Sequence, residues 1–273
     1  GKATLFLNHG SSNNTIIKNH FENLVNINAL TSHTSSNNVI TQNYFSNAGH
    51  DWHTVNDLSG YRNNYNNNSF HSCTGESRDE NWLYAACISF YSYSSVFTSF
   101  PDARYGGEHI VENNTFENYN IGVSVLSYQN NNTLRNNKLN DGVHGLGLWN
   151  WIRGSTAPSG NLILNNTINN TRYPLVLDYF HAGYPGTNNS IISNSIINTE
   201  GGAITVWSTF KDFTIRDNYI ENASQGIWIY DDLFGEITNG FIVNNIVKNV
   251  TGNAISAYTG STISMENIHV VNN

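Results

Sequence analysis

The sequence predicts an all-β fold, a parallel solenoid of about ten coils in which each coil contributes several short strands. Three observations predict it. An asparagine-containing phrase recurs ten times, a second aliphatic phrase lies between its copies, and the composition disfavours helix. Asparagine makes up 48 of the 273 residues, and this residue favours turns over helix interiors. A mainly helical protein is therefore excluded.

The first phrase places an asparagine between short aliphatic or aromatic stretches, as in Asn14-Thr-Ile-Ile-Lys-Asn19-His-Phe21-Glu-Asn23. Its middle asparagines are spaced by 23–29 residues, apart from one step of 46, and are Asn19, Asn43, Asn68, Asn114, Asn137, Asn166, Asn194, Asn218, Asn245 and Asn272. Repeats of this length are typical of solenoids, in which each coil buries its apolar face only against its neighbours. We expect these asparagines to form a hydrogen-bonded ladder that satisfies buried polar groups.

The second phrase is a short strand with alternating aliphatic residues, such as Leu146-Gly-Leu148 and Ile204-Thr-Val206. Alternate residues of a strand point to opposite faces, so the aliphatic residues of this phrase should face the core. The whole chain, 1–273, then forms one β-solenoid domain. The repeat is interrupted at about 48–62 and 73–107, and long loops on a solenoid usually build a functional face.

The ends of the chain also carry information. Leu5-Phe-Leu7 matches the second phrase without the first, and the chain stops within a coil. Solenoids need capping ends, so we expect a part of a longer protein with further domains.

The charge pattern limits the partners. The chain has 12 Lys and Arg against 20 Asp and Glu, a net charge of −8, without a basic block, so no nucleic-acid partner is expected. No apolar run approaches the ~18 residues of a membrane span, so no membrane insertion is expected. No phosphate-cradling glycine motif follows a strand, and no cofactor is predicted.

The repeats, together with strands such as Gly226-Ile-Trp-Ile229, resemble the right-handed parallel β-helix repeats of the pectin-lyase-like superfamily. The resemblance covers nearly the whole chain and implies a right-handed parallel β-helix. That superfamily contains polysaccharide lyases, glycoside hydrolases, epimerases and phage tailspikes. The asparagine-rich, low-charge texture is also similar to disaggregatase-related domains of archaeal cell-surface proteins, which break down a chondroitin-like polysaccharide. The resemblance thus implies an extracellular or cell-surface enzyme acting on a matrix polysaccharide. The motifs of galacturonan hydrolases do not occur together here, so their catalytic residues are not carried over.

Strand parity predicts a column of outward-facing residues. If Leu146 and Leu148 face the core, then Trp149 and Trp151 face outward. Repeated over the coils, the column reads Tyr91, Leu126, Trp149, Asp178, Trp207, Tyr230 and Tyr258, with Trp228 beside it. Sugar rings stack on aromatic rings, and coils rise by about 4.8 Å, comparable with the length of a sugar residue. We predict a polysaccharide groove here. The alternative is that loops or a missing domain cover these rings as a second small core.

Asp178 is the acid of this column and lies between Trp149 and Trp207. Partial desolvation would raise its pKa and suit a general acid. Asp231 and Asp232 follow two coils later, about 9.6 Å along the stack. Flexible side chains could bring the carboxyl separation near the ~6.5–9.5 Å of an inverting glycosidase. The primary prediction is a glycoside hydrolase. Alternatively, Asp231-Asp232 is a solvated turn and Asp178 bonds the backbone.

Two further functions remain open. A polysaccharide lyase acting on uronates could use Tyr179, His181 and Arg153, which follow the same strands and would also contact substrate. A non-catalytic glycan-binding or adhesin module would need only the aromatic column.

Three further features of the sequence give weaker indications of function. His50-Asp51-x-His53 has metal-ligand chemistry but no third ligand at a defined spacing, so we predict loop hydrogen bonding and no metal site. Cys73 and Cys87 form either a disulfide or two small core residues. Sequons such as Asn113-Asn-Thr115, Asn165-Asn-Thr167, Asn222-Ala-Ser224 and Asn249-Val-Thr251 are interpreted as parts of the ladder corner, without glycosylation.

Overall fold

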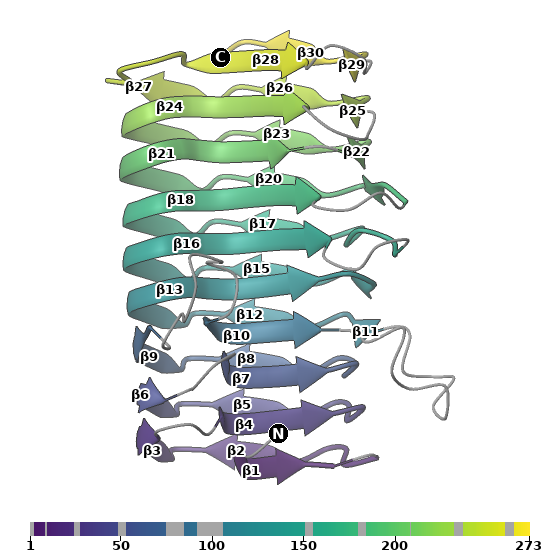
Figure 1. Cartoon of the computed structure of the whole chain (residues 1–273), viewed down its shortest axis with the longest axis vertical. Helices are drawn as coiled ribbons and strands as arrows, with labels where there is room; N and C mark the ends of the chain where they lie inside the picture. The colour runs from purple at the N-terminus through teal and green to yellow at the C-terminus, as the bar shows by residue number, and fades with distance from the viewer. Residues whose placement is uncertain are drawn as a thin grey trace.

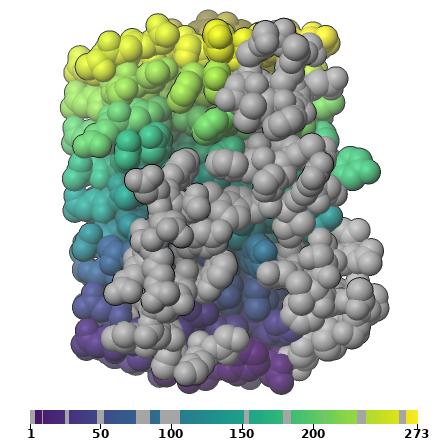
Figure 2. Space-filling model, viewed as in Figure 1, coloured from purple at the N-terminus to yellow at the C-terminus, as the bar shows by residue number. Residues whose placement is uncertain are grey.

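The protein is a right-handed parallel β-helix with no helix among the residues described (Figure 1). The computed structural model describes residues 3–8, 10–24, 28–48, 53–74, 85–91, 106–150, 155–179, 184–207, 209–231, 237–259 and 265–273. The chain winds into about eight turns, a count that differs slightly from the ten coils predicted. In Figure 2 the turns appear as successive bands from purple to yellow.

A 14-stranded parallel sheet forms the front of the view in Figure 1. Its main path consists of β1 (Ala3–Leu7), β4 (Asn28–His33), β7 (His53–Leu58), β10 (Ala86–Tyr91), β13 (Thr115–Leu126), β16 (Lys138–Asn150), β18 (Thr167–Tyr179), β21 (Ser195–Trp207), β24 (Tyr219–Asp231) and β27 (Ile246–Lys248). Off this path lie β3 (His20–Leu24), β6 (Tyr44–Ala48), β9 (Ser69–Cys73) and β28 (Ile255–Thr259). From β13 to β24 each long strand combines the two shorter strands of the earlier coils.

A ten-stranded parallel sheet lies behind the long strands in Figure 1. It contains β2 (Thr15–Ile17), β5 (Val39–Thr41), β8 (Asn64–Asn66), β12 (Ile110–Glu112), β15 (Thr133–Arg135), β17 (Leu162–Leu164), β20 (Ser190–Ile192), β23 (Thr214–Arg216), β26 (Phe241–Val243) and β30 (His269–Val271). Two small sheets complete the turns, namely β11 (Gly106–Gly107) with β14 (Gln129–Asn130), and β19 (Gly186–Thr187) with β22 (Phe210–Lys211), β25 (Ile237–Thr238) and β29 (Met265–Glu266).

The core is a narrow stack of side chains repeated at each coil, as the alternation of the sequence predicts. The rings of Phe21, Phe45, Phe70 and Phe116 stack with centroids 4.7–5.0 Å apart and planes within 7°. Leu139 and later aliphatic residues continue this column in register with Phe116. Because identical positions meet coil after coil, the period of the sequence sets the register of the fold.

The predicted asparagine ladder is present and runs through the stack. Each ladder Oδ1 accepts the backbone N–H of the ladder asparagine before it at 2.8–3.0 Å, from Asn19 through Asn245. The bond between Asn68 and Asn114 shows that the 46-residue step is one coil. The ladder continues to Asn273 and not to Asn272 as predicted, because Asn272 has the left-handed φ of 52° typical of the preceding corner residue.

A second ladder, which the sequence analysis did not identify, follows another corner. It joins Asn14, Asn38 and Asn63, and later Asn132, Asn161 and Asn189. His109 takes an asparagine position between these two groups, since its Nδ1 accepts the N–H of Asn63 at 3.2 Å and its own N–H donates to Asn132. The imidazole stacks on Phe90 with centroids 4.3 Å apart.

A buried carboxylate accompanies this histidine inside the solenoid. Asp57 lies at a core-facing position of β7 and accepts hydrogen bonds from Asn63 Nδ2 at 2.8 Å and Tyr65 Oη at 2.7 Å. Its Oδ2 lies 3.8 Å from His109 Nδ1. Burial, followed by the charge and hydrogen bond of Asp57, raises the pKa of Tyr65, and burial lowers the pKa of His109. We interpret the cluster as a structural part of the core, in which buried polar side chains satisfy one another.

The insertions differ in detail from the prediction. Residues 53–58 form β7, which pairs in register with β4 and β10, and Tyr61 bridges to Ser36 and Gly107. Much of the predicted first insertion, 48–62, is therefore a regular part of a coil. Within 73–107, β10 and β11 are likewise regular strands, and residues 75–84 and 92–105 lie outside the described residues.

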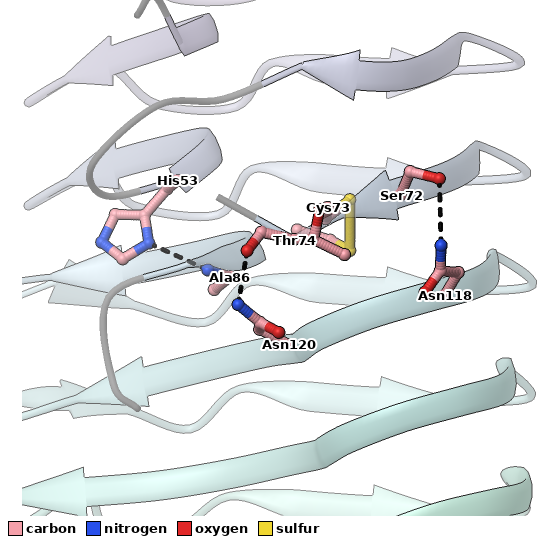
Figure 3. The surroundings of a disulfide bond; sticks show 8 residues. His53, Ser72, Cys73, Thr74, Ala86, Asn118 and Asn120 are labelled. Atoms are coloured by element: carbon pink, nitrogen blue, oxygen red, sulfur yellow. Dashed lines mark hydrogen bonds between the residues drawn. A yellow bond between two sulfur atoms is a disulfide. The ribbon is translucent and has the colours of Figure 1, made fainter. Parts of the chain in front are cut away.

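Cys73 and Cys87 form a disulfide, so the first of the two alternatives is confirmed. The bridge joins the end of β9 to β10, with Cα atoms 5.3 Å apart (Figure 3). Asn120 Nδ2 donates to the carbonyl of Thr74 at 2.5 Å, and Ala86 N–H donates to His53 Nδ1 at 3.3 Å. Three separate interactions thus fix the two ends of the segment between β9 and β10.

Candidate functional site: the outward face of the long strands

The predicted outward column exists as one line across six strands. The register pairs Leu126 with Trp149, Trp149 with Asp178, and Asp178 with Trp207. It continues from Trp207 to Tyr230 and from Tyr230 to Tyr258. Each member lies on the next coil, so the column rises by about one strand spacing, ~4.8 Å, per residue. Side chains up to about 130 residues apart in sequence therefore form a single row.

The C-terminal half of the column is a ladder of partly exposed aromatic rings. Tyr258 is 59% exposed, and its ring stacks on Tyr230 with centroids 5.5 Å apart and planes at 13°. Tyr230 also contacts Trp207 at 6.0 Å and Trp228 at 5.3 Å. Trp228 lies two residues before Tyr230 on β24, which widens the row to two columns. These four residues, which we call the aromatic strip, form a continuous surface of rings.

The N-terminal half of the column is closed. Trp149 is fully buried and packs with Leu126 and Val176, against which Tyr91 and Tyr173 also pack. This small cluster lies on the outside of the sheet, as in the alternative of a second small core. The predicted role of Trp149 as an exposed stacking platform therefore does not fit this conformation, because its ring presents no face to solvent. A Cβ on Gly147 would lie 2.0 Å from Trp149 Nε1, so only glycine leaves room for the indole.

Asp178 lies at the junction of the two halves. It neighbours Trp149 on β16 and Trp207 on β21, as the sequence predicts, and only 3% of its surface is exposed. Its burial agrees with the desolvation that the sequence predicts for this position. The closed cluster on one side and the aromatic strip on the other place this acid at the end of the exposed row.

The remaining predicted catalytic and binding residues cannot be placed. The backbone of Asp231 pairs with Thr259 one coil on, and that of Tyr179 pairs with Asn150. Trp151, Arg153, His181 and Asp232 lie outside the described residues, as do His50 and Asp51. The distance between Asp178 and its proposed partner acid therefore stays a prediction. Among the described residues, no group of three or more His, Cys, Asp or Glu could hold a metal ion.

Sequence parity missed two residues of the outer cluster, His144 and Tyr173. The parity of β16 and β18 would turn both toward the core. Instead, the His144 ring stacks on Tyr173 at 5.0 Å and meets Trp149 edge-on at 5.4 Å. The two residues pair with each other in the regular register of β16 with β18, so both rings turn outward together. Burial and, to a smaller extent, Arg172 lower the pKa of His144 to about 4.

Fold and site together define a β-solenoid with an outward aromatic row. The chain belongs to the family described as the right handed beta helix region, whose match spans residues 104–273. No curated protein sequence matches the chain significantly. Across the described residues, no helix has the length and apolarity to cross a membrane.

The chain is similar to several solved structures at low identity. The surface protein and adhesin PfbA of Streptococcus pneumoniae is 13% identical, with a TM-score of 0.54 over 88% of this chain and 69% of that chain. The A-module of the mannuronan C-5 epimerase AlgE4 of Azotobacter vinelandii is 12% identical, with a TM-score of 0.46 over 95% and 80%. The D317A mutant of the periplasmic alginate epimerase AlgG is 10% identical, with a TM-score of 0.40 over 94% and 76%.

Proposed function

We propose that the protein binds a polysaccharide along the aromatic strip and acts on it at Asp178. The observation that carries this proposal is the in-register row of Asp178, Trp207, Tyr230 and Tyr258, with one residue on each coil. A polysaccharide presents an apolar ring face at a spacing comparable with the ~4.8 Å rise of the coils. Solvent-facing rings that touch one another over several strands mark a binding surface.

The reaction proposed is glycoside hydrolysis. Asp178 would donate the proton to the leaving oxygen, while Asp231 or Asp232 would act as the base that activates water. The substrate class is a matrix polysaccharide of the chondroitin type. The Cys73–Cys87 disulfide supports an extracellular or cell-surface location, because disulfides persist in oxidising compartments.

A non-catalytic glycan-binding module is the second candidate. The burial of Asp178 and the closed cluster around Trp149 favour it, since a substrate must reach the acid for catalysis. A uronate lyase using Tyr179, His181 and Arg153 is the third candidate. The same experiment separates all three.

The experiment measures binding and cleavage on a panel of acidic and neutral polysaccharides, chondroitin among them. Hydrolysis releases reducing ends, whereas a lyase also creates an unsaturated uronate that absorbs ultraviolet light. We expect reducing ends without that absorbance, and Asp178→Asn should abolish turnover while leaving binding intact. Asp212→Asn, an exposed acid at a corner beside the small sheets, is the control. Unchanged turnover in Asp178→Asn would remove the catalytic assignment, and binding without any cleavage would leave the glycan-binding module.

A further inference from the structure

Most sequons of this chain place two asparagines side by side, and the structure can give the two different roles. In Asn113-Asn114-Thr115, Asn114 is the buried ladder residue and bonds Asn137. Asn113, the residue that a glycosyl transfer would modify, is exposed at φ 57°. The sequence analysis assigned the sequons to the ladder corner, and the structure places the acceptor at that corner, directly before the ladder asparagine. The ladder explains the second asparagine only.

The same arrangement recurs around the stack. Of the nine sequons in the sequence, eight have an acceptor that is exposed and has positive φ, namely Asn13, Asn67, Asn113, Asn131, Asn165, Asn188, Asn222 and Asn249. An exposed corner side chain has room for a bulky substituent. A ladder asparagine has no such room, because its side-chain oxygen and its side-chain nitrogen both make hydrogen bonds between coils.

The acceptors differ in how far their amides are engaged. Asn165 Nδ2 donates to Asn136 Oδ1 at 2.8 Å, and Asn222 Nδ2 donates to Asn198 Oδ1 at 3.1 Å. The side chains of Asn13, Asn113, Asn131 and Asn188 make no hydrogen bond to another described residue. Glycosylation at these four positions therefore costs the folded protein no contact between coils.

The location of the acceptors suits a chain that binds through its other face. Six of the eight lie at corners that border the ten-stranded sheet, which is behind the long strands in Figure 1. Glycans there would leave the aromatic strip open. The Cys73–Cys87 disulfide points to an oxidising, exported environment, in which sequons on exposed corners meet glycosyl transferases.

We propose that the exposed corner asparagines are N-glycosylation sites, above all the four whose side chains make no hydrogen bond, Asn113 and Asn188 among them. In the reaction, Nδ2 of the asparagine forms a bond to C1 of a sugar supplied by a lipid-phosphate-linked oligosaccharide. The bond between C1 and the phosphate oxygen breaks, the lipid phosphate leaves, and the amide loses one proton. The transferase is an external enzyme, and the hydroxyl of the residue two positions on, Thr115 or Ser190, is what it recognises.

The test is glycopeptide mapping by mass spectrometry of the protein exported by its own host. Asn113 and Asn188 should carry glycan. The chain contains a matched control, because Asn136 occupies the next corner position with φ 56° but is followed by Asn137-Lys138 and so has no sequon. Asn136 should be unmodified.

Two variants make the test sharper. Thr115→Val keeps a β-branched residue at the start of β13 and should remove the glycan from Asn113 alone. Lys138→Thr should add one at Asn136, a gain that a misfolded variant could not imitate at a single site. Exported protein with bare asparagine at both Asn113 and Asn188 would overturn the proposal, as would glycan that persists in Thr115→Val.

Discussion

Tyr230 and Tyr258 lie on successive coils with their rings stacked almost parallel, 5.5 Å apart. Their separation of 28 positions in the sequence makes one turn of the solenoid, so their contact follows directly from the register of β24 with β28. Tyr258 is the most exposed member of the aromatic strip. The pair offers a flat apolar surface at the spacing of the coils.

Removing one of these rings should weaken glycan binding. We expect Tyr258→Ala to reduce the affinity about tenfold, a loss of about 1.4 kcal/mol, because an exposed ring contributes mainly through its contact with the ligand. Titration calorimetry on the polysaccharide identified in the panel would measure this. Phe241→Ala is the control, since Phe241 is similarly exposed but lies on β26 of the other sheet. Equal losses in the two variants would contradict a specific strip.

Adjacent asparagines should contribute very differently to the stability of the fold, because only one of the two belongs to the ladder. Asn114→Ala leaves the backbone N–H and the amide of Asn68 without their shared acceptor. Each buried unsatisfied donor costs about 1–3 kcal/mol, so we expect a total loss of about 2–4 kcal/mol. Asn113→Gly, one residue away at an exposed left-handed corner, should change stability by less than ~0.5 kcal/mol because glycine tolerates positive φ. Urea unfolding followed by circular dichroism compares the two, and similar midpoints would refute the assignment.

The disulfide should stabilise the coil that contains β9 and β10. It closes a loop with a sequence separation of 14, for which a loss of about 3 kcal/mol is expected on removal. The double variant Cys73→Ala with Cys87→Ala should unfold at a lower temperature than the wild type. Reductant should lower the wild-type midpoint toward that of the variant and leave the variant unchanged. A reductant effect of the same size in the variant would show that another process is responsible.

Stability should fall in mild acid because of buried histidines. Burial lowers the pKa of His53 to about 3, and burial with a smaller effect of Arg172 lowers the pKa of His144 to about 4. These histidines take up protons at a higher pH in the unfolded chain than in the folded chain. The stability that they contribute as neutral, buried side chains is therefore fully present above about pH 6.5. It is lost as the pH falls from there toward the folded pKa values. Denaturant midpoints measured from about pH 7 down to about pH 4.5 would follow this loss.

One histidine can be isolated by substitution. His144→Gln should reduce the acid-induced loss of stability by about 2–3 kcal/mol, while His53 and His109 keep their own contributions. His20→Gln is the control, because His20 is an exposed histidine on β3. A pH profile of His144→Gln that parallels the wild type would show that His144 is not protonated on unfolding in this range.

Much of the fold could be predicted because the solenoid is nearly one-dimensional. The spacing of Asn19, Asn43 and Asn68 equals one turn, so the period of the sequence is also the register of the strands. Parity then placed Trp149, Asp178 and Trp207 in one outward row. The same rule failed for His144 and Tyr173, because their rings pack against each other and against Trp149 across neighbouring coils, a contact that no single repeat encodes.

By itself, the sequence determined the solenoid, its ladder and the alignment of the outward row, because these depend on periodicity and alternation within each repeat. Only the tertiary structure decided which members of the row are accessible. Trp149 and Tyr258 occupy equivalent positions on their coils, yet the first is fully buried and the second is 59% exposed. Burial depends on what packs over a side chain from neighbouring coils, and that is a relationship between segments which the local pattern of either segment does not contain.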